Sequence, residues 1–446
     1  MFDKMTSEEA KVKILDLVKE YHDTFHIKKK FTKGDRVNYA GRVYNSDEIC
    51  NLTDAALEFW LTSGRFTKQF ENGLAEYLCM KHSLLVNSGS SANLLAFMSL
   101  TSPLLGERAI KRGDEVISVA ASFPTTVSPI VQYGAVPVFV DLTIPQYNID
   151  VSQLENALTE KTKAVFIAHT LGNPYDLKAV KEFCDKYGLW HIEDNCDALG
   201  SKYTLDGKEY LTGTIGDIGT SSFFPAHHIT MGEGGAVYTN DSTLKKIMLS
   251  MRDWGRDCMC LPGQDNLCGH RFDGQFGELP RGYDHKYVYS HFGYNFKATD
   301  MQAAIGVAQL DKLDSFGHAR RRNFKLLKEA LSVSSEKLIL PEACQNSDPS
   351  WFGFPITCKE GVDRNKLVRQ LEDTGIQTRT LFAGNIIRHP CFIDMCKEGT
   401  DYRIVGSLKV TDRIMHDTFW VGVYPGLDER AIAYMAEAIM NFSRNN

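Results

Sequence analysis

The chain has 446 residues, of which 43% are hydrophobic and 24% charged, and this is the composition of a globular protein with a large core. Its formal net charge of -6 and pI near 6.1 argue against broad binding to nucleic acids or anionic membranes. The charged N-terminal stretch and the lack of any apolar run of about 18 residues predict a cytoplasmic protein without a membrane span.

The first predicted elements are an amphipathic helix at 7–22 and a basic, extended arm around Lys28. From about residue 82, short β-branched runs alternate with helical segments. We expect strands at 84–86, 115–119, 136–140, 164–168 and 189–193, and helices near 91–100, 125–133, 151–158 and 177–187. This alternation predicts an α/β fold with a mostly parallel sheet, in which ligands bind beyond the carboxyl ends of the strands.

The second half of the chain begins with a long irregular segment at 255–292, and loops of this length are usually functional or disordered. After a basic helix near 318–331 we expect a smaller α+β unit, with a strand at 351–357 and a last helix at 427–443. The predicted organisation is an N-terminal helix and arm (1–55), a large domain (56–315) and a small C-terminal domain (316–446).

Polar motifs follow three of the expected strands. Asn87–Asn93 opens a helix, where N–H groups and hydroxyls suit a phosphate, although a plain helix cap uses the same residues. Asp194 ends a strand, where it can pair with a protonated pyridine nitrogen or simply cap the next turn. Ser222 opens a loop that returns at Gly232–Gly235. Phe123 can stack on a planar ring or serve as a core aromatic.

Cysteines form the other unusual pattern. The chain has 11 of them, and an odd number without a signal peptide argues against a disulfide framework. Cys196 follows Asp194 by two positions, while Cys258, Cys260 and Cys268 fall in the long irregular segment. Four thiolates can hold an iron–sulfur cluster or a structural zinc, although a one-residue gap between two ligands is unusual for zinc.

Together these motifs resemble the sugar aminotransferase superfamily of pyridoxal-phosphate (PLP) fold type I, over roughly residues 45–440. The resemblance rests on Asn87–Asn93, Ser122–Thr126, Ile192–Asp194, Ser222–Gly235, Gly293–Phe296 and Met301–Ala304. It implies that the phosphate is bound by Gly89, Ser90 and Ser222, that Phe123 stacks on the ring, and that Asp194 pairs with the pyridine nitrogen. It also implies a homodimer in which Asn295 reaches the phosphate of the partner subunit.

His227 stands where this superfamily carries its Schiff-base lysine, and no lysine occurs between Lys208 and Lys245. Histidine cannot form a Schiff base, but it can move protons near neutral pH. On this residue alone, an inactive relative and an enzyme with a histidine base are both open.

The four cysteines favour an enzyme with a histidine base over an inactive relative. Together with His227 they resemble the CDP-6-deoxy-L-threo-D-glycero-4-hexulose-3-dehydrase branch. That resemblance implies pyridoxamine phosphate (PMP), His227 as base, and a [2Fe–2S] cluster on Cys196, Cys258, Cys260 and Cys268. It further implies a CDP-linked 4-keto-6-deoxyhexose as substrate, a 3,6-dideoxysugar precursor of surface polysaccharide as product, and an NAD(P)H-dependent flavin iron–sulfur reductase as partner.

Two alternatives stay open: an iron-free, glutamate-dependent 3-dehydratase, and a non-catalytic PLP-fold protein with a structural zinc. Asp197 departs from the Gln or His usual at its position, and the gap from Cys196 to Cys258 is a few residues longer than usual. One insertion around 205–208 would explain the longer gap. The segments Arg379–Leu381 and His389–Pro390 fall where the superfamily places substrate-facing loops.

Overall fold

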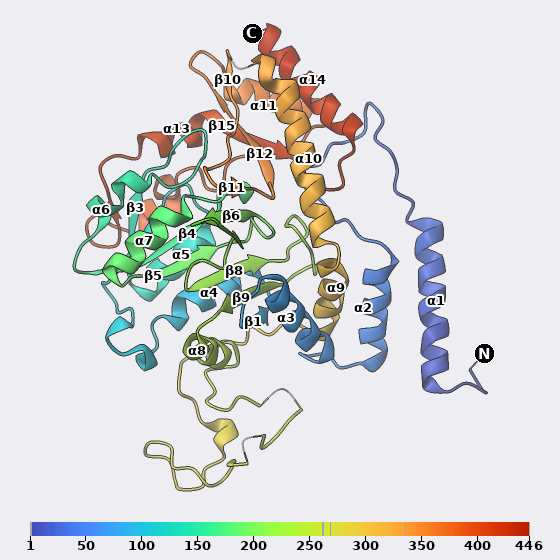
Figure 1. Cartoon of the computed structure of the whole chain (residues 1–446), viewed down its shortest axis with the longest axis vertical. Helices are drawn as coiled ribbons and strands as arrows, with labels where there is room; N and C mark the ends of the chain where they lie inside the picture. The colour runs from blue at the N-terminus through green and yellow to red at the C-terminus, as the bar shows by residue number, and fades with distance from the viewer. Residues whose placement is uncertain (1, 261–262, 268, 335, 446) are drawn as a thin grey trace.

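The computed structural model describes residues 2–260, 263–267, 269–334 and 336–445. At its centre lies an eight-stranded sheet in the order β1-β9-β8-β5-β4-β2-β3-β14 (Figure 1). The strands from β8 to β14 in this order run parallel, whereas β9 is antiparallel to both β8 and β1. The strands are β1 (His82–Val86), β2 (Glu115–Val119), β3 (Val136–Val140), β4 (Thr162–Ala168), β5 (Trp190–Asp194), β8 (Ile218–Ser222), β9 (Gly235–Thr239) and β14 (Arg403–Ile404). The predicted α/β class with a mostly parallel sheet is confirmed.

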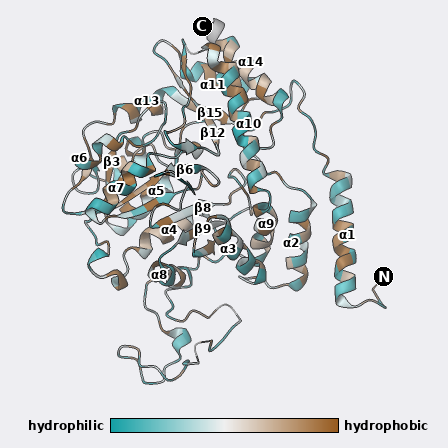
Figure 2. Ribbon diagram, in the orientation of Figure 1, coloured by the Kyte–Doolittle hydropathy of each residue, from teal (hydrophilic) through white to brown (hydrophobic). Residues whose placement is uncertain are grey.

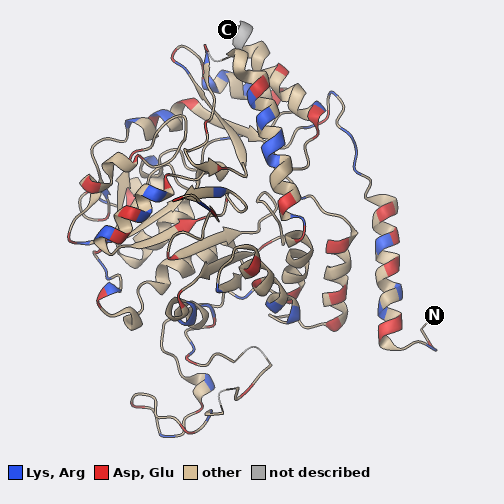
Figure 3. Ribbon diagram, in the orientation of Figure 1, with Lys and Arg blue, Asp and Glu red and all other residues tan. Residues whose placement is uncertain are grey.

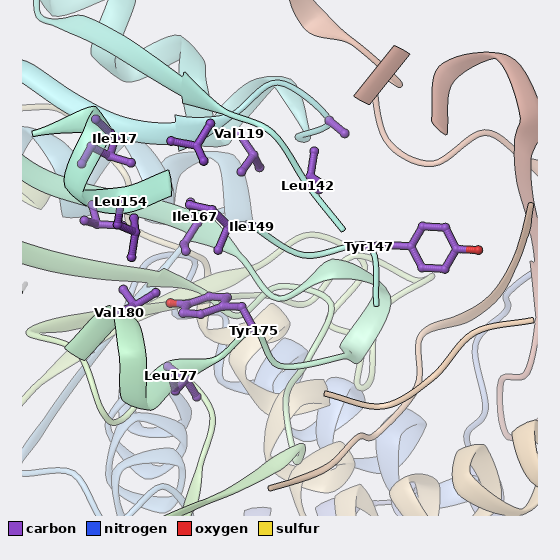
Figure 4. Packing of buried hydrophobic residues seen from close by; sticks show 14 of the residues in the cluster. Ile117, Val119, Leu142, Tyr147, Ile149, Leu154, Ile167, Tyr175, Leu177 and Val180 are labelled. Carbon is purple, nitrogen blue, oxygen red and sulfur yellow. The ribbon is translucent and has the colours of Figure 1, made fainter. Parts of the chain in front are cut away.

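Helices cover both faces of this sheet, because successive side chains of a strand point to opposite sides. Val116 of β2 packs with residues of α4 (Gly89–Ser99), α5 (Pro124–Tyr133) and α8 (Ser242–Arg252). Its neighbour Ile117 packs toward α6 (Leu154–Ala157) and α7 (Leu177–Tyr187). Figure 4 shows this second face, where Ile117 and Ile167 of the sheet lie near Val180 of α7. Strand β3 (Val136–Val140) is therefore apolar along its whole length, whereas β2, β5 and β8 also bury polar side chains.

The N-terminal part adds helices beside the sheet. The predicted first helix is α1 (Ser7–Phe25), which Thr6 and Glu9 begin with a capping box. It packs against α2 (Ser46–Glu58), but none of its residues is buried, and apolar and polar residues alternate along it in Figure 2. Behind it, α2 and α3 (Arg65–Tyr77) pack against α9 (Asp300–Leu310). None of the described helices is both long and apolar enough to cross a membrane.

The C-terminal part has its own core between a four-stranded sheet and three helices. The basic helix α10 (Leu313–Leu331), conspicuous by its Lys and Arg residues in Figure 3, leads into it. The predicted strand near 351–357 is β12 (Gly353–Cys358), and the last helix is α14 (Glu429–Asn445). The other elements here are β10 (Leu338–Ile339), β11 (Ser347–Asp348), α11 (Arg364–Asp373), β13 (Thr378–Arg379), α12 (Pro390–Met395), α13 (Lys409–Asp417) and β15 (Thr418–Gly422).

Two segments cross between these parts. β14 comes from the C-terminal part and pairs in parallel with β3 at the edge of the large sheet. Conversely, β6 (Lys202–Leu205) and β7 (Lys208–Leu211) form a small sheet with β11. The domain limits at 55 and 315 stay predictions.

The long segment at 255–292 is irregular in its described residues apart from short turns such as His285–Tyr287, and it projects below α8 in Figure 1. Its base is a narrow stem in which Asp253 lies opposite Asn295, and Arg256 lies opposite Tyr289. Several of its large apolar side chains are exposed.

Candidate functional site

The start of α4 builds a cradle suited to an anion. Ser88 caps the helix by accepting a hydrogen bond from the Ser91 N–H at 3.1 Å, so the helix begins at Gly89 with its first N–H groups and partial positive charge at the cavity. A Cβ on Gly89 would lie 2.3 Å from the Cβ of Ser222, and only glycine therefore allows the end of β8 to approach so closely. Gly89, Ser90 and Ser222 meet as the sequence predicted.

A cavity of about 480 Å³ opens beside this cradle, beyond the carboxyl ends of β1, β5 and β8. Seven of the predicted site residues line it: Gly89, Ser90, Phe123, Asp194, Cys196, Ser222 and His227. Phe123 is 52% exposed, so it is a rim residue and not the core aromatic that its position also allowed. The cavity combines an anion cradle, an aromatic wall and a carboxylate, as a phosphorylated planar ring requires.

Asp194 is held rigidly at the floor of this cavity. Its Oδ2 accepts hydrogen bonds from Asn93 Nδ2 at 2.8 Å and Thr126 Oγ1 at 2.7 Å, and its Oδ1 accepts one from the Cys196 N–H at 3.2 Å. Asn93 and Thr126 stand within the recognised motifs, but sequence reasoning assigned them no role. These donors fix the orientation of a carboxylate that can face a protonated ring nitrogen.

Next to it, Glu193 points to the opposite side of β5 and is buried. Burial raises the cost of its charge, yet hydrogen bonds from His169 Nε2 at 2.9 Å and the Gly216 N–H at 2.5 Å hold its pKa below the usual range. Glu193 thus anchors the segment after β7 and leaves Asp194 as the carboxylate of the cavity.

His227 lines the cavity, and its ring stacks on Phe352 with centroids 5.4 Å apart. Its Nε2 lies 3.3 Å from Oδ1 of Asp197, and Arg320 donates a hydrogen bond to its carbonyl oxygen at 3.1 Å. Burial raises the pKa of Asp197. Burial also lowers the pKa of Arg320 to about 9, although the negative charge of Asp197 partly offsets that lowering. The position at which the sequence departs from its superfamily therefore contacts the candidate base.

His228 has a different environment from its neighbour. Its Nε2 donates to the carbonyl oxygen of Ser350 at 2.6 Å, and the side chain is buried. Burial, reinforced by the nearby Arg320 cation, sets the pKa of His228 well below the usual value, so it stays neutral. Of these two histidines, it is His227 that lines the cavity, as predicted.

The outer wall comes from segments far away in the sequence. Arg379, Thr380 and His389 line it, and the expectation that their two segments face the substrate stays a prediction. The guanidinium of Arg379 lies 3.9 Å above the ring of Tyr39. Sequence reasoning missed the aromatic residues of this wall, which are Tyr39, Phe352, Phe382 and Trp420.

Asn295 lies outside this cavity. Its side chain is exposed and accepts a hydrogen bond from Lys297 Nζ at 2.6 Å. Its expected contact with the phosphate of a partner subunit stays a prediction.

The cysteines separate into two places. Cys196 lines the cofactor-sized cavity, where burial raises its pKa well above the usual value. Cys258 and Cys260 line a second cavity of about 620 Å³, whose other residues include Lys81, His82, Lys245 and Lys246. Cys268 lies outside the described residues. Within the described ranges, Cys196 and the pair Cys258 and Cys260 thus line separate cavities, and their joint binding of a metal stays a prediction.

Comparisons with known proteins agree with this geometry. The chain is 54% identical to the lipopolysaccharide biosynthesis protein RfbH of Salmonella typhimurium, over 98% of this chain and 99% of that protein. It is 48% identical to the dTDP-4-dehydro-2,6-dideoxy-D-glucose 3-dehydratase of Saccharopolyspora spinosa, over 97% of this chain and 92% of that protein.

Among solved structures, E. coli GDP-4-keto-6-deoxy-D-mannose-3-dehydratase with bound hydrated PLP superposes with a TM-score of 0.80 and 29% identity, over 91% of this chain and 99% of that chain. The predicted fold type I architecture is therefore confirmed. The model of the DegT/DnrJ/EryC1/StrS aminotransferase family matches residues 43–440. The chain belongs to this aminotransferase family.

Proposed function

We propose that the protein is a PMP-dependent 3-dehydrase that removes the C3 hydroxyl of a CDP-linked 4-keto-6-deoxyhexose, toward the 3,6-dideoxysugars of lipopolysaccharide. The observation that carries the proposal is His227, a histidine in place of lysine, in one cavity with Asp194 and the anion cradle. The names of two relatives support it, since one is a lipopolysaccharide biosynthesis protein and the other a nucleotide-sugar 3-dehydratase.

The cavity residues fit the cofactor. Gly89, Ser90 and Ser222 would hold its phosphate, Phe123 would cover the ring, and Asp194 would keep the ring nitrogen protonated. When bound, PMP supplies an amine that condenses with a keto sugar and a ring that accepts electrons. Because the loop from Ser222 to Gly235 has no lysine, binding must be non-covalent.

In this arrangement His227 is the proton-transfer group. With cofactor and sugar bound, its imidazole would accept a proton from them and would return one to the departing C3 hydroxyl. Asp197, 3.3 Å from Nε2, stabilises the imidazolium that forms in between. Phe352 restricts the ring by stacking, so that the proton moves along a fixed direction.

The proposal includes a [2Fe–2S] cluster on Cys196, Cys258, Cys260 and Cys268, a homodimer with Asn295 at the shared site, and the flavin iron–sulfur reductase as partner. Lys81, Lys245 and Lys246 line the same cavity as Cys258 and Cys260, and their positive charges would offset the negative charge of a thiolate-ligated cluster.

A second candidate is the iron-free, glutamate-dependent 3-dehydratase. It is favoured by the separation of Cys196 from Cys258 and Cys260 in one chain, because that reaction needs no cluster. The non-catalytic zinc protein is the third possibility.

Metal content tests these candidates together. Protein purified without oxygen is expected to be brown and to hold about two iron and two sulfide per chain. Colourless protein with zinc would favour the non-catalytic candidate, and metal-free protein that deoxygenates its substrate with glutamate would favour the iron-free enzyme.

Substitution of the base tests the chemistry. His227→Asn is expected to slow loss of the C3 hydroxyl by at least about 100-fold, while PMP still binds. Mass spectrometry of the sugar product and absorbance titration of PMP measure the two effects. His318→Asn, at an exposed histidine of α10, is the matched control. Full activity of the His227→Asn protein would refute the assignment.

A further inference from the structure

The two groups of cysteines lie at opposite ends of the parallel strands of the central sheet. Cys196 follows the carboxyl end of β5, beside the cofactor-sized cavity. Cys258 and Cys260 lie with Lys81 and His82, at the amino end of β1, which runs in the same direction as β5. A strand of five residues spans roughly 16 Å. Since cluster thiolates bond directly to the irons, the sheet separates these ligands too far for one chain to hold a cluster on both groups.

The segment that carries Cys258 and Cys260 also presents apolar side chains that its own chain leaves exposed. Met259 is 54% exposed, Tyr289 is 54% exposed, and Phe292 is 100% exposed. All three are close in sequence to the stem that Asp253 and Asn295 form. Exposed apolar residues on a projecting segment are typical of a surface that another protein covers.

The mouth of the cofactor-sized cavity also exposes apolar side chains. Phe123 and Phe224 line the cavity and are 52% and 44% exposed. Cys196 lies in the same cavity. The chain thus carries both halves of a cysteine set, each beside exposed apolar residues, on two separate surfaces.

We infer that the cysteine set is completed between two copies of this chain, with Cys258 and Cys260 of one subunit meeting the partner's Cys196. A twofold axis makes the contact reciprocal, so each dimer would hold two complete sets. A second copy of the chain supplies both Cys196 and, around it, the exposed apolar residues Phe123 and Phe224 at the mouth of the cavity. This inference rests on the proposed function, because it concerns the cluster proposed there.

Mixed dimers test the inference directly. One subunit carries Cys196→Ala, the other carries Cys258→Ala with Cys260→Ala, and two affinity tags isolate the mixed species after co-expression. If the set spans the subunits, one of the two sites in the mixed dimer has every cysteine. We expect about half of the wild-type iron and sulfide per dimer, with the visible absorbance of a [2Fe–2S] cluster, and none in either homodimeric variant.

Other outcomes would contradict it. A mixed dimer without iron, beside loaded wild-type protein, would overturn the inference and leave the proposed function intact. Full iron in the Cys196→Ala homodimer, or a loaded wild-type monomer, would also overturn it. Wild-type protein without a cluster would instead refute the iron–sulfur part of the proposed function and the inference with it. Dimer size and PMP binding of each variant verify that it folds.

Discussion

At the scale of single residues, the pair of His227 and Asp197 determines how the cavity can handle protons. Asp197 is buried among His227, Asp194 and Arg320, and burial raises its pKa. A carboxylate in such a place is useful only while it is ionised, because only the charged form stabilises an imidazolium. We therefore expect the pKa of Asp197 to set the acidic limit of the pH range in which the enzyme is active.

We expect Asp197→Asn to lower the turnover rate by roughly 100-fold, with little change in PMP affinity, because it removes that stabilising charge. Wild-type activity should fall as the pH drops through the raised pKa of Asp197, since protonation has the same effect as the substitution. Rate measurements across pH check this. The variant should lack that acidic limb, and an unchanged profile would show that Asp197 has no part in proton transfer. Asp197→Glu should retain part of the activity.

At the scale of elements, the approach of α4 to β8 shapes the anion cradle. Strands β8 and β9 were not predicted: Gly, Ser and Thr dominate β8, while β9 was missed although its Val, Tyr and Thr residues favour strands. Close packing requires the glycine that begins β9, since a Cβ on Gly235 would lie 2.3 Å from the carbonyl oxygen of Ser88.

Gly89→Ala is expected to push α4 away from Ser222, because the added methyl group would lie 2.3 Å from the Ser222 Cβ. Such overpacking should reduce the free energy of unfolding by about 1–3 kcal/mol and weaken PMP binding. Urea denaturation and absorbance titration measure the two effects. Adding Ser222→Gly should recover part of the stability, and an equally unstable double variant would argue against a clash at this contact.

Some elements of the fold could be predicted from the spacing of apolar residues alone. Strands β2 and β3 and helix α7 were predicted with their observed limits, because a fully buried strand and an amphipathic helix each have a distinct spacing of apolar residues. Gly89, Phe123 and Asp194 follow strands that the sequence predicted, whereas Ser222 and His227 were found through the resemblance to the superfamily. Tyr39, Phe352 and Trp420 were not, since their place in the wall depends on tertiary packing between segments hundreds of residues apart.

At the scale of the whole molecule, β14 connects the two halves. Arg403 of β14 donates hydrogen bonds to Glu115 Oε2 at 2.8 Å and to the carbonyl oxygen of Ala157 at 2.6 Å. Burial raises the cost of the Glu115 charge, but Arg403 and Thr159 hold its pKa below the usual value. A lowered pKa stabilises the fold above the pKa of the unfolded chain, and this contribution is lost as the pH falls through the lowered value.

Arg403→Ala should therefore lower the free energy of unfolding by about 1–3 kcal/mol at pH 7, and by less at a pH where Glu115 is protonated. Thermal unfolding at both pH values measures the difference. Arg413→Ala, which removes an exposed i,i+4 pair with Asp417, is the control and should cost under about 0.5 kcal/mol. Equal losses at both pH values would mean that Arg403 acts through packing alone.

The parallel pairing of β14 with β3 also restricts how the cavity can open. Residues of the C-terminal part supply the outer wall of the cavity. The same part contributes β14, which is hydrogen-bonded to β3 at the edge of the large sheet. A rigid-body rotation of the C-terminal part relative to the large sheet would break the pairing of β14 with β3. Substrate entry should instead depend on small rearrangements of the rim, such as rotation of Phe123 and Phe382, whose rings are 6.5 Å apart.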